Sequence, residues 1–179
     1  LIIGAHNRIR ENVTMNTGTE GGGGVTRVGD GGLFMASSHV AHDCQIGNHT
    51  IFANNAQRAG HVHVGDHAIL GGFTGVHQFA RVGAHSMTAV GTVLLQDLPP
   101  YVIAAGNTAK PFGINSEGLR RRGFSSEAIS AVKRAYKLIY RSGMALEEAR
   151  LKICGEAESQ PALSLLAEFL SEPGRGIIR

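Results

Sequence analysis

The sequence has no tryptophan, and it is poor in proline, cysteine, aromatic residues and charge. Of 179 residues, 5 are proline and 2 are cysteine, while 6% are aromatic and 17% are charged. So little proline excludes a collagen-like chain. Cys44 and Cys154 lie too far apart in the chain to suggest a disulfide framework, and we expect a reducing, cytoplasmic location. No apolar run reaches the roughly 18 residues of a membrane-spanning helix, and no signal peptide is recognisable.

Glycine is the residue type in excess. The 25 glycines argue against a helix bundle, because each glycine inside a helix costs about 0.5–1 kcal/mol relative to alanine. Apolar residues still make up 42% of the chain, which is enough for a sizeable core. Together these numbers favour a turn-rich β architecture with a helical piece.

Charge is distributed unevenly along the chain. Residues 1–110 carry six basic and six acidic side chains, whereas residues 111–179 carry eleven basic and eight acidic ones, a net charge of +3. This shift predicts a domain boundary near Pro111, with one domain at 1–110 and another at 111–179.

A repeat of six residues fills most of the first part. Its first positions are apolar in ten of twelve cases: Val28, Phe34, Val40, Ile46, Phe52, Arg58, Val64, Leu70, Val76, Val82, Thr88 and Leu94. A Val-Gly or Ile-Gly pair also recurs every 18 residues from Val28, and Gly21 to Gly24 look like an insertion before the first pair. A period of six fits neither an amphipathic helix nor an alternating strand. It predicts a left-handed parallel β-helix with three short strands per coil, whose coils bury their apolar edges against each other.

From residue 115 the pattern becomes helical. Ser125 or Ser126 is a candidate N-cap, apolar residues then recur at a spacing of 3–4 up to Tyr140, and Ser142-Gly143 ends the helix. Further helices are expected at 145–158 and 162–171. The basic surface of this part is either a solvated cap over the open end of the β-helix or a dock for an acidic partner or phosphates.

Residues 18 apart stack in such a β-helix, so His42, Gly60 and Gln78 should form one column. His39, His61 and His77 lie close to it in the sequence, so we expect these histidines to cluster across three coils. A second column, His49, His67 and His85, is expected to face solvent.

The His42 cluster admits two kinds of chemistry. One is zinc binding, but no histidine has another five residues further on, the spacing of β-helical carbonic anhydrases, and we expect neither a metal nor a cofactor. The other is general base catalysis by His42. Asp43 could orient or stabilise it, although neighbours on a strand point to opposite faces. The Gly60 backbone N–H could donate to an oxyanion.

Several motifs resemble those of the acyl-carrier-protein-dependent UDP-N-acetylglucosamine O-acyltransferases, which open lipid A synthesis. They are His39-Val-Ala-His-Asp-Cys44, Ala59-Gly-His61, Val76-His-Gln-Phe79, Pro99-Pro-Tyr-Val-Ile103, the segment from Asn115 to Phe124, and the ending Arg175-Gly-Ile-Ile-Arg179. The resemblance implies transfer of a 3-hydroxyacyl group from acyl carrier protein to the sugar 3-hydroxyl in the cytoplasm of a Gram-negative bacterium. It further implies a homotrimer with active sites between subunits, acyl carrier protein docking on the basic helices, and no nucleic-acid partner.

The same resemblance implies roles for individual residues. His42 would be the general base, Asp43 its partner, and Gly60 the oxyanion donor. The sugar and acyl pocket would be lined by His39, His61, His77 and Gln78. The nucleotide would be bound by Asn115, Glu117, Arg121 and Arg122, and bidentate Arg–phosphate contacts suit that role.

Three departures from the family pattern bear on activity. About four N-terminal coils are missing, and the chain begins without an initiator methionine, so we expect a fragment. Arg58 stands where the repeat calls for an aliphatic residue. Val90 stands where some members have glycine, so we expect it to shorten the acyl chain accepted. Two alternatives therefore remain: another sugar-nucleotide acyltransferase of the same fold, possibly using coenzyme A, and an inactive trimeric scaffold.

Overall fold

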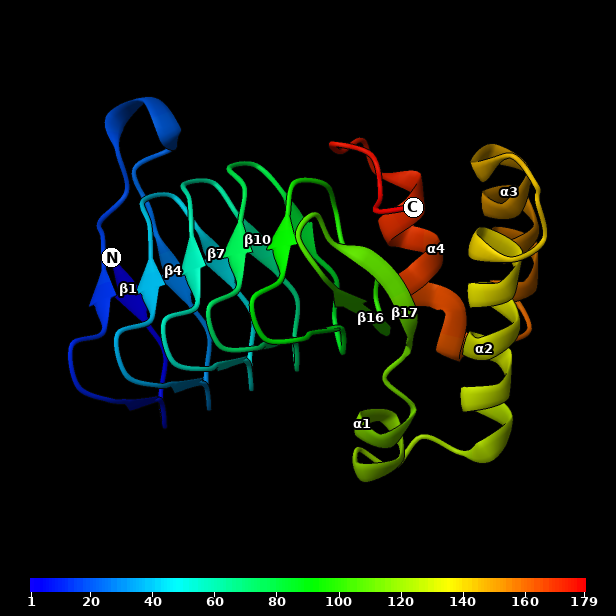
Figure 1. Cartoon of the computed structure of the whole chain (residues 1–179), viewed down its shortest axis with the longest axis horizontal. Helices are drawn as coiled ribbons and strands as arrows, with labels where there is room; N and C mark the ends of the chain where they lie inside the picture. The colour runs from blue at the N-terminus through cyan, green and yellow to red at the C-terminus, as the bar shows by residue number, and fades with distance from the viewer.

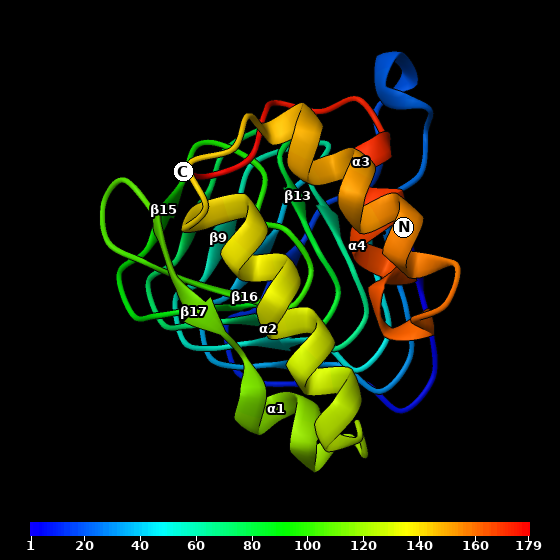
Figure 2. The same ribbon diagram turned by 90° about the vertical axis from the view of Figure 1, so that its right-hand side faces the viewer.

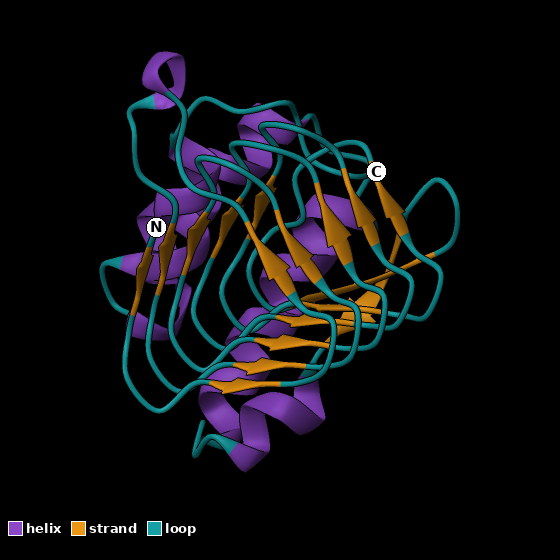
Figure 3. Ribbon diagram, turned by 90° about the vertical axis from the view of Figure 1, so that its left-hand side faces the viewer, coloured by secondary structure: helices purple, strands orange, loops and turns teal.

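The computed structural model describes all residues 1–179 and confirms the predicted fold. A left-handed parallel β-helix is followed by a small group of helices at the C-terminal end (Figure 1). Viewed along its axis, the β-helix has a triangular section with one sheet on each side (Figure 3).

The strands of the β-helix are short and form three sheets, named here faces A, B and C. Face A holds β1 (Ile2–Ile3), β4 (Arg27–Val28), β7 (Gln45–Ile46), β10 (His63–Val64) and β13 (Arg81–Val82). Face B holds β2 (Arg8–Ile9), β5 (Leu33–Phe34), β8 (Ile51–Phe52), β11 (Ile69–Leu70), β14 (Met87–Thr88), β16 (Val102–Ala105) and β17 (Lys110–Ile114). Face C holds β3 (Thr14–Met15), β6 (His39–Val40), β9 (Gln57–Arg58), β12 (Gly75–Val76) and β15 (Val93–Leu94).

The repeat sets the register between coils. His39 pairs with Gln57, and Gln57 pairs with Gly75, so neighbouring coils are 18 residues apart. Thr14 and His39 are 25 residues apart in the pairing below, because the segment between β3 and β4 adds seven residues and contains the short 3₁₀ turn η1 (Glu20–Gly22). This segment projects from the body of the β-helix (Figures 1 and 3).

The chain turns between faces at three corners, which are named by the faces they join. Residues 42–43, 60–61 and 78–79 form the C–A corner, residues 48–49, 66–67 and 84–85 the A–B corner, and residues 54–55, 72–73 and 90–91 the B–C corner. The second residue of each corner has a left-handed backbone, with φ between 54° and 68°, even where it is not glycine. This conformation is uncommon for residues with a side chain, and it decides how the C–A corner is built.

The second residue of each repeat strand points into the β-helix and the first points out. Phe34 and Phe52 stack at 5.0 Å inside it, and Cys44 is fully buried among the core residues, as its position in the repeat predicted. Each coil therefore gains its core only by stacking on the next one.

Four helices lie across the C-terminal end of the β-helix (Figure 2). They are α1 (Ser116–Arg121), α2 (Ser126–Tyr140), α3 (Leu146–Ala157) and α4 (Ser164–Ser171), the last preceded by the 3₁₀ turn η2 (Pro161–Leu163). The three expected helices are confirmed. Ser125 is the N-cap of α2, its side chain accepting a hydrogen bond from the Ala128 N–H. None of the helices is long and apolar enough to cross a bilayer.

Candidate functional site

A groove of about 670 Å³ runs along face C beside the C–A corner. Five of the residues predicted for catalysis or binding line it: His39, His42, Gly60, His77 and Gln78. The 18-residue register is what brings them together, because it stacks β6, β9 and β12 side by side.

His42 and Asp43 form a hydrogen-bonded pair at the C–A corner. The His42 Nδ1 lies 2.8 Å from the Asp43 Oδ2, with the imidazole 39% exposed and the carboxylate fully buried. Strand geometry would have pointed the two side chains apart. Asp43 instead has a left-handed backbone with φ of 60°, so its carboxylate turns toward the imidazole.

Asp43 is held in its charged form. Burial would raise the pKa of its carboxyl group, but hydrogen bonds from His42 and Thr19 outweigh that effect and lower the pKa to about 2. A carboxylate that is ionised at neutral pH can only accept, so the Nδ1 of His42 donates to it. The Nε2 of His42 is then left as the proton acceptor.

Gly60 packs directly against His42. A Cβ at this position would overlap the imidazole ring, so only glycine allows the ring to lie where it does. The Gly60 N–H makes no hydrogen bond within the chain, although its carbonyl accepts one from the Phe79 N–H. A free backbone donor thus lies beside the His42 ring.

His61 lies behind the pair rather than in the groove. Its ring packs edge-on against His42 at 5.2 Å and stacks on Phe79 at 4.6 Å. Its Nε2 is 3.8 Å from the Asp43 Oδ2. His61, His42 and Asp43 could each offer one atom to a metal ion, and these atoms lie within 4.8 Å of each other. The 2.8 Å contact between His42 and Asp43 is hydrogen-bond geometry, which suits proton transfer.

The other groove residues are fixed by local contacts. The His39 Nδ1 is 2.7 Å from the Thr14 Oγ1, and burial together with the Arg58 charge lowers the pKa of His39. The His77 Nδ1 lies 2.9 Å from the carbonyl oxygen of Gln78. These contacts leave the Nε2 atoms of both rings for a ligand in the groove.

The four residues predicted to bind the nucleotide lie at a different corner. Asn115 caps α1 and donates to the His85 carbonyl at 3.0 Å, and Arg122 donates to the His67 carbonyl at 3.2 Å. Both contacts are at the A–B corner, whereas His42 is at the C–A corner. Glu117 pairs with Arg120 and with Arg121, whose side chain is 77% exposed. A single chain therefore does not join the two predicted groups of residues.

The expectation that His49, His67 and His85 all face solvent was wrong. Only His49 is exposed, and His85 is buried. The three rings stack in series and Tyr101 continues the stack, while Phe124 packs edge-on against His85. The helical part covers this end of the column, which a repeat pattern alone does not show.

Arg58 points into the β-helix, where the repeat places an apolar residue. Its guanidinium lies over the Phe52 ring at 3.5 Å and donates to the His39 carbonyl at 2.6 Å, while Nε and Nη1 have no partner. Burial lowers its pKa to about 9. Val90, at the B–C corner, is 73% exposed and does not itself line the groove.

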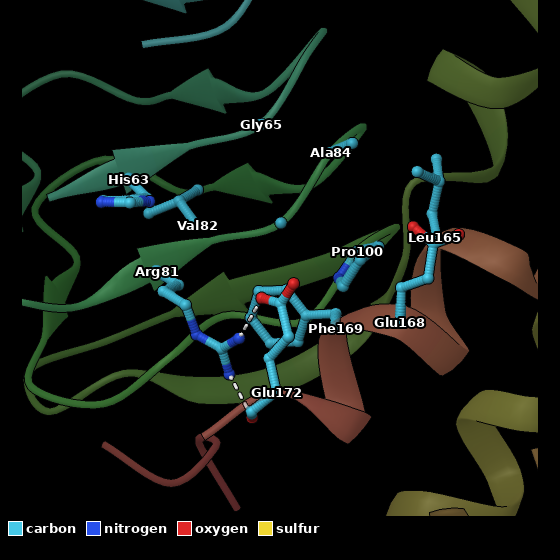
Figure 4. A pocket seen from close by; sticks show the side chains of 11 residues that line it. His63, Gly65, Arg81, Val82, Ala84, Pro100, Leu165, Glu168, Phe169 and Glu172 are labelled. Atoms are coloured by element: carbon cyan, nitrogen blue, oxygen red, sulfur yellow. Dashed lines mark hydrogen bonds and ion pairs between the residues drawn. The ribbon is translucent and has the colours of Figure 1, made fainter. Parts of the chain in front are cut away.

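A second cavity, of about 230 Å³, lies between face A and α4 (Figure 4). Its main polar feature is Arg81, which pairs with the buried Asp97 at 2.9 Å and with Glu172 at 3.1 Å. The guanidinium also lies over the Phe169 ring. These contacts fasten α4 to the β-helix, and none of the predicted site residues lines this cavity.

Sequence reasoning did not find Thr19, which donates two hydrogen bonds to Asp43. The only available signal was the glycine-rich insertion at 21–24, which interrupts the repeat one coil before Asp43.

Comparison with known proteins points to one family. A family model described as UDP N-acetylglucosamine O-acyltransferase, domain 2, matches residues 97–178. An acyl-[acyl-carrier-protein]–UDP-N-acetylglucosamine O-acyltransferase of Thiobacillus denitrificans is 56% identical over 179 residues, covering 100% of this chain and 69% of that protein. A protein of the same name from a Janthinobacterium species is 57% identical over 183 residues, with 100% and 70% covered.

Solved structures agree with the sequence matches. The UDP-N-acetylglucosamine acyltransferase of Francisella novicida superposes with a TM-score of 0.97 at 39% identity, covering 99% of this chain and 66% of that chain. The chain therefore spans about two thirds of the length of these relatives.

Proposed function

Because this chain belongs to the acyl-[acyl-carrier-protein]–UDP-N-acetylglucosamine O-acyltransferase family, we propose that it transfers a 3-hydroxyacyl group from acyl carrier protein to the 3-hydroxyl of UDP-N-acetylglucosamine. This transfer is the first step of lipid A synthesis. The observation that carries the proposal is the pairing of His42 with a buried, ionised Asp43 in a groove that a free backbone N–H also lines.

The proposed mechanism is a direct acyl transfer with His42 as general base. The His42 Nε2 removes the proton of the sugar 3-hydroxyl while the oxygen attacks the thioester carbonyl. The Asp43 carboxylate stabilises the imidazolium that forms, and the Gly60 N–H donates to the oxyanion of the tetrahedral intermediate. When that intermediate collapses, the thiolate of the carrier's prosthetic group leaves and takes the proton back from His42.

The groove residues divide between the two substrates in this proposal. His39, His77 and Gln78 bind the sugar and the acyl chain, and His61 supports the pair from behind through its contact with Asp43. Asn115, Glu117, Arg121 and Arg122 bind the nucleotide, with the exposed Arg121 the best placed for a phosphate. The basic helices receive the acidic carrier protein.

A homotrimer would join the two groups of residues. Since the A–B and C–A corners are separate in one chain, a second copy has to bring its α1 to the His42 groove. Face B offers a surface for such contacts, because its outward side chains form an apolar row: Leu33, Ile51, Ile69, Met87 and Ile103 pair in register across five coils. The half-buried row suits an interface between copies. We infer a cytoplasmic location in a Gram-negative bacterium, which agrees with two free cysteines.

The deciding experiment is acyl transfer from 3-hydroxyacyl carrier proteins of several chain lengths to UDP-N-acetylglucosamine. We expect turnover by the wild type and its loss, by about 100-fold or more, in His42→Ala. Light scattering should give the same trimer for both. A coenzyme A thioester that worked as well as the carrier protein would favour the other acyltransferase class, and a trimer or aggregate inactive with every donor would favour a scaffold.

A further inference from the structure

The glycine-rich segment between β3 and β4 is the one irregularity of the β-helix. It adds seven residues to a coil that otherwise follows the repeat, and its tip is the η1 turn, which ends at Gly23 with a left-handed backbone. Such an insertion contributes little to the apolar core, since η1 has no buried residue. Its contacts must therefore be sought elsewhere.

Those contacts converge on Asp43. The Thr19 N–H donates to Oδ1 at 2.9 Å, and the Thr19 hydroxyl donates to Oδ2 at 2.7 Å. On the other side of the same corner, the Asp43 N–H donates to the Thr26 hydroxyl at 2.7 Å. Gly22 closes over the carboxylate so tightly that a Cβ would overlap it.

One oxygen of the carboxylate is shared. Oδ2 accepts both from the Thr19 hydroxyl and from the His42 Nδ1, so the hydroxyl fixes the plane in which the imidazole is held. A buried carboxylate with fewer donors would be free to rotate about its χ2 torsion or to take up a proton. The donors from the inserted segment prevent both.

We propose that Thr19 is a positioning residue for acyl transfer, and that the glycine-rich insertion exists to hold the Asp43 carboxylate against His42. The inference rests on the function proposed above for His42 and Asp43. Thr19 is itself exposed at the surface, and it touches the site only through Asp43. The lost hydroxyl of a Thr19 variant should therefore act on the reaction and leave folding almost unchanged.

The test compares Thr19→Val with Thr19→Ser and with Thr17→Val in the 179-residue chain. Valine keeps the shape and the backbone N–H but loses the hydroxyl, serine keeps the hydroxyl, and Thr17 makes no side-chain hydrogen bond in the same segment. We expect Thr19→Val to lower kcat about tenfold with KM for UDP-N-acetylglucosamine nearly unchanged, since hydrogen bonds to charged groups are worth roughly that factor or more. Thr19→Ser should restore most of kcat, and Thr17→Val should behave as wild type.

A double-variant cycle separates positioning from a general structural effect. In an Asp43→Asn background, Thr19→Val should lower kcat by less than about twofold, because the partner through which it acts has already been altered. An unchanged kcat in Thr19→Val, a loss that serine does not restore, or a full tenfold loss in the Asp43→Asn background would each overturn the proposal.

Failure of the proposed reaction would be visible separately. If the wild type transfers no acyl group, the ¹⁵N shifts of the His42 ring in histidine-labelled protein still report on its bond to Asp43. A changed ring spectrum in Thr19→Val, but not in Thr17→Val, would support the positioning contact without the reaction. Identical spectra would overturn it.

Discussion

The imidazole of His42 lies against the Cα of Gly60, one coil further along the β-helix, with no room for a Cβ between them. The Gly60 N–H beside the ring has no partner in the chain. A proton acceptor and a hydrogen-bond donor are therefore held next to each other by the 18-residue register of the coils. Gly60 serves this arrangement through the side chain it lacks and the N–H it offers.

Replacing Gly60 by alanine should reduce activity sharply. The new Cβ would displace the His42 ring from Asp43 and crowd the donor, so we expect kcat to fall by about 100-fold, the size of effect that loss of an oxyanion donor has. Steady-state acyl transfer measures it. Gly155→Ala is the matched control, because a Cβ there meets nothing within 4 Å; equal activity of Gly60→Ala and wild type would contradict the proposed role.

Replacing Arg58 by leucine should stabilise the protein. Arg58 is a buried cation with two unpartnered nitrogens, and exchanging buried charge for an apolar side chain often gains about 1–4 kcal/mol. Leucine also restores the pattern of the repeat. Urea unfolding should show a higher midpoint for Arg58→Leu, and the exposed Arg27→Leu should differ from wild type by less than about 0.5 kcal/mol. A lower midpoint for Arg58→Leu would show that its contacts with Phe52 and His39 outweigh its burial.

His85 should make the protein less stable in weak acid. Burial, followed by the charges of His67 and Arg122, lowers its pKa to about 4 from 6.5. Between these two pH values the unfolded chain binds a proton that the folded chain does not, so stability rises with pH there, by at most about 1.4 kcal/mol per pH unit. His85→Phe should flatten this dependence, which thermal unfolding at pH 4 to 7 would reveal as a smaller change in Tm. The same slope in both proteins would rule His85 out as its source.

Val90 should influence the length of acyl chain that is accepted. It stands at the B–C corner just before β15, and Val93 and Leu95 from that region line the groove. Val90→Gly should shift preference toward donors one or two methylenes longer, by about fourfold in kcat/KM for each methylene. Val90→Ile should shift it the other way. Competition between 3-hydroxyacyl carrier proteins of different lengths measures both, and an unchanged preference would exclude Val90 as the length determinant.

The sequence determined the fold and the column of residues that forms the groove. A repeat of six with apolar first positions has one regular solution, and the 18-residue spacing of His42, Gly60 and Gln78 follows from it. The helices were also predictable, because caps and 3–4 spacing are local signals. The two-domain division at 110/111, which falls inside β17, stays a prediction.

Only the tertiary structure decided how the groups around His42 meet. The left-handed backbone of Asp43 turns two sequence neighbours toward each other, and an insertion with no repeat pattern places Thr19 on the same carboxylate. Packing of Tyr101 and Phe124 buries His85, and the route of the chain into α1 sets Arg122 at another corner. These contacts join residues through backbone conformation and long-range packing, and neither is encoded in a periodic pattern.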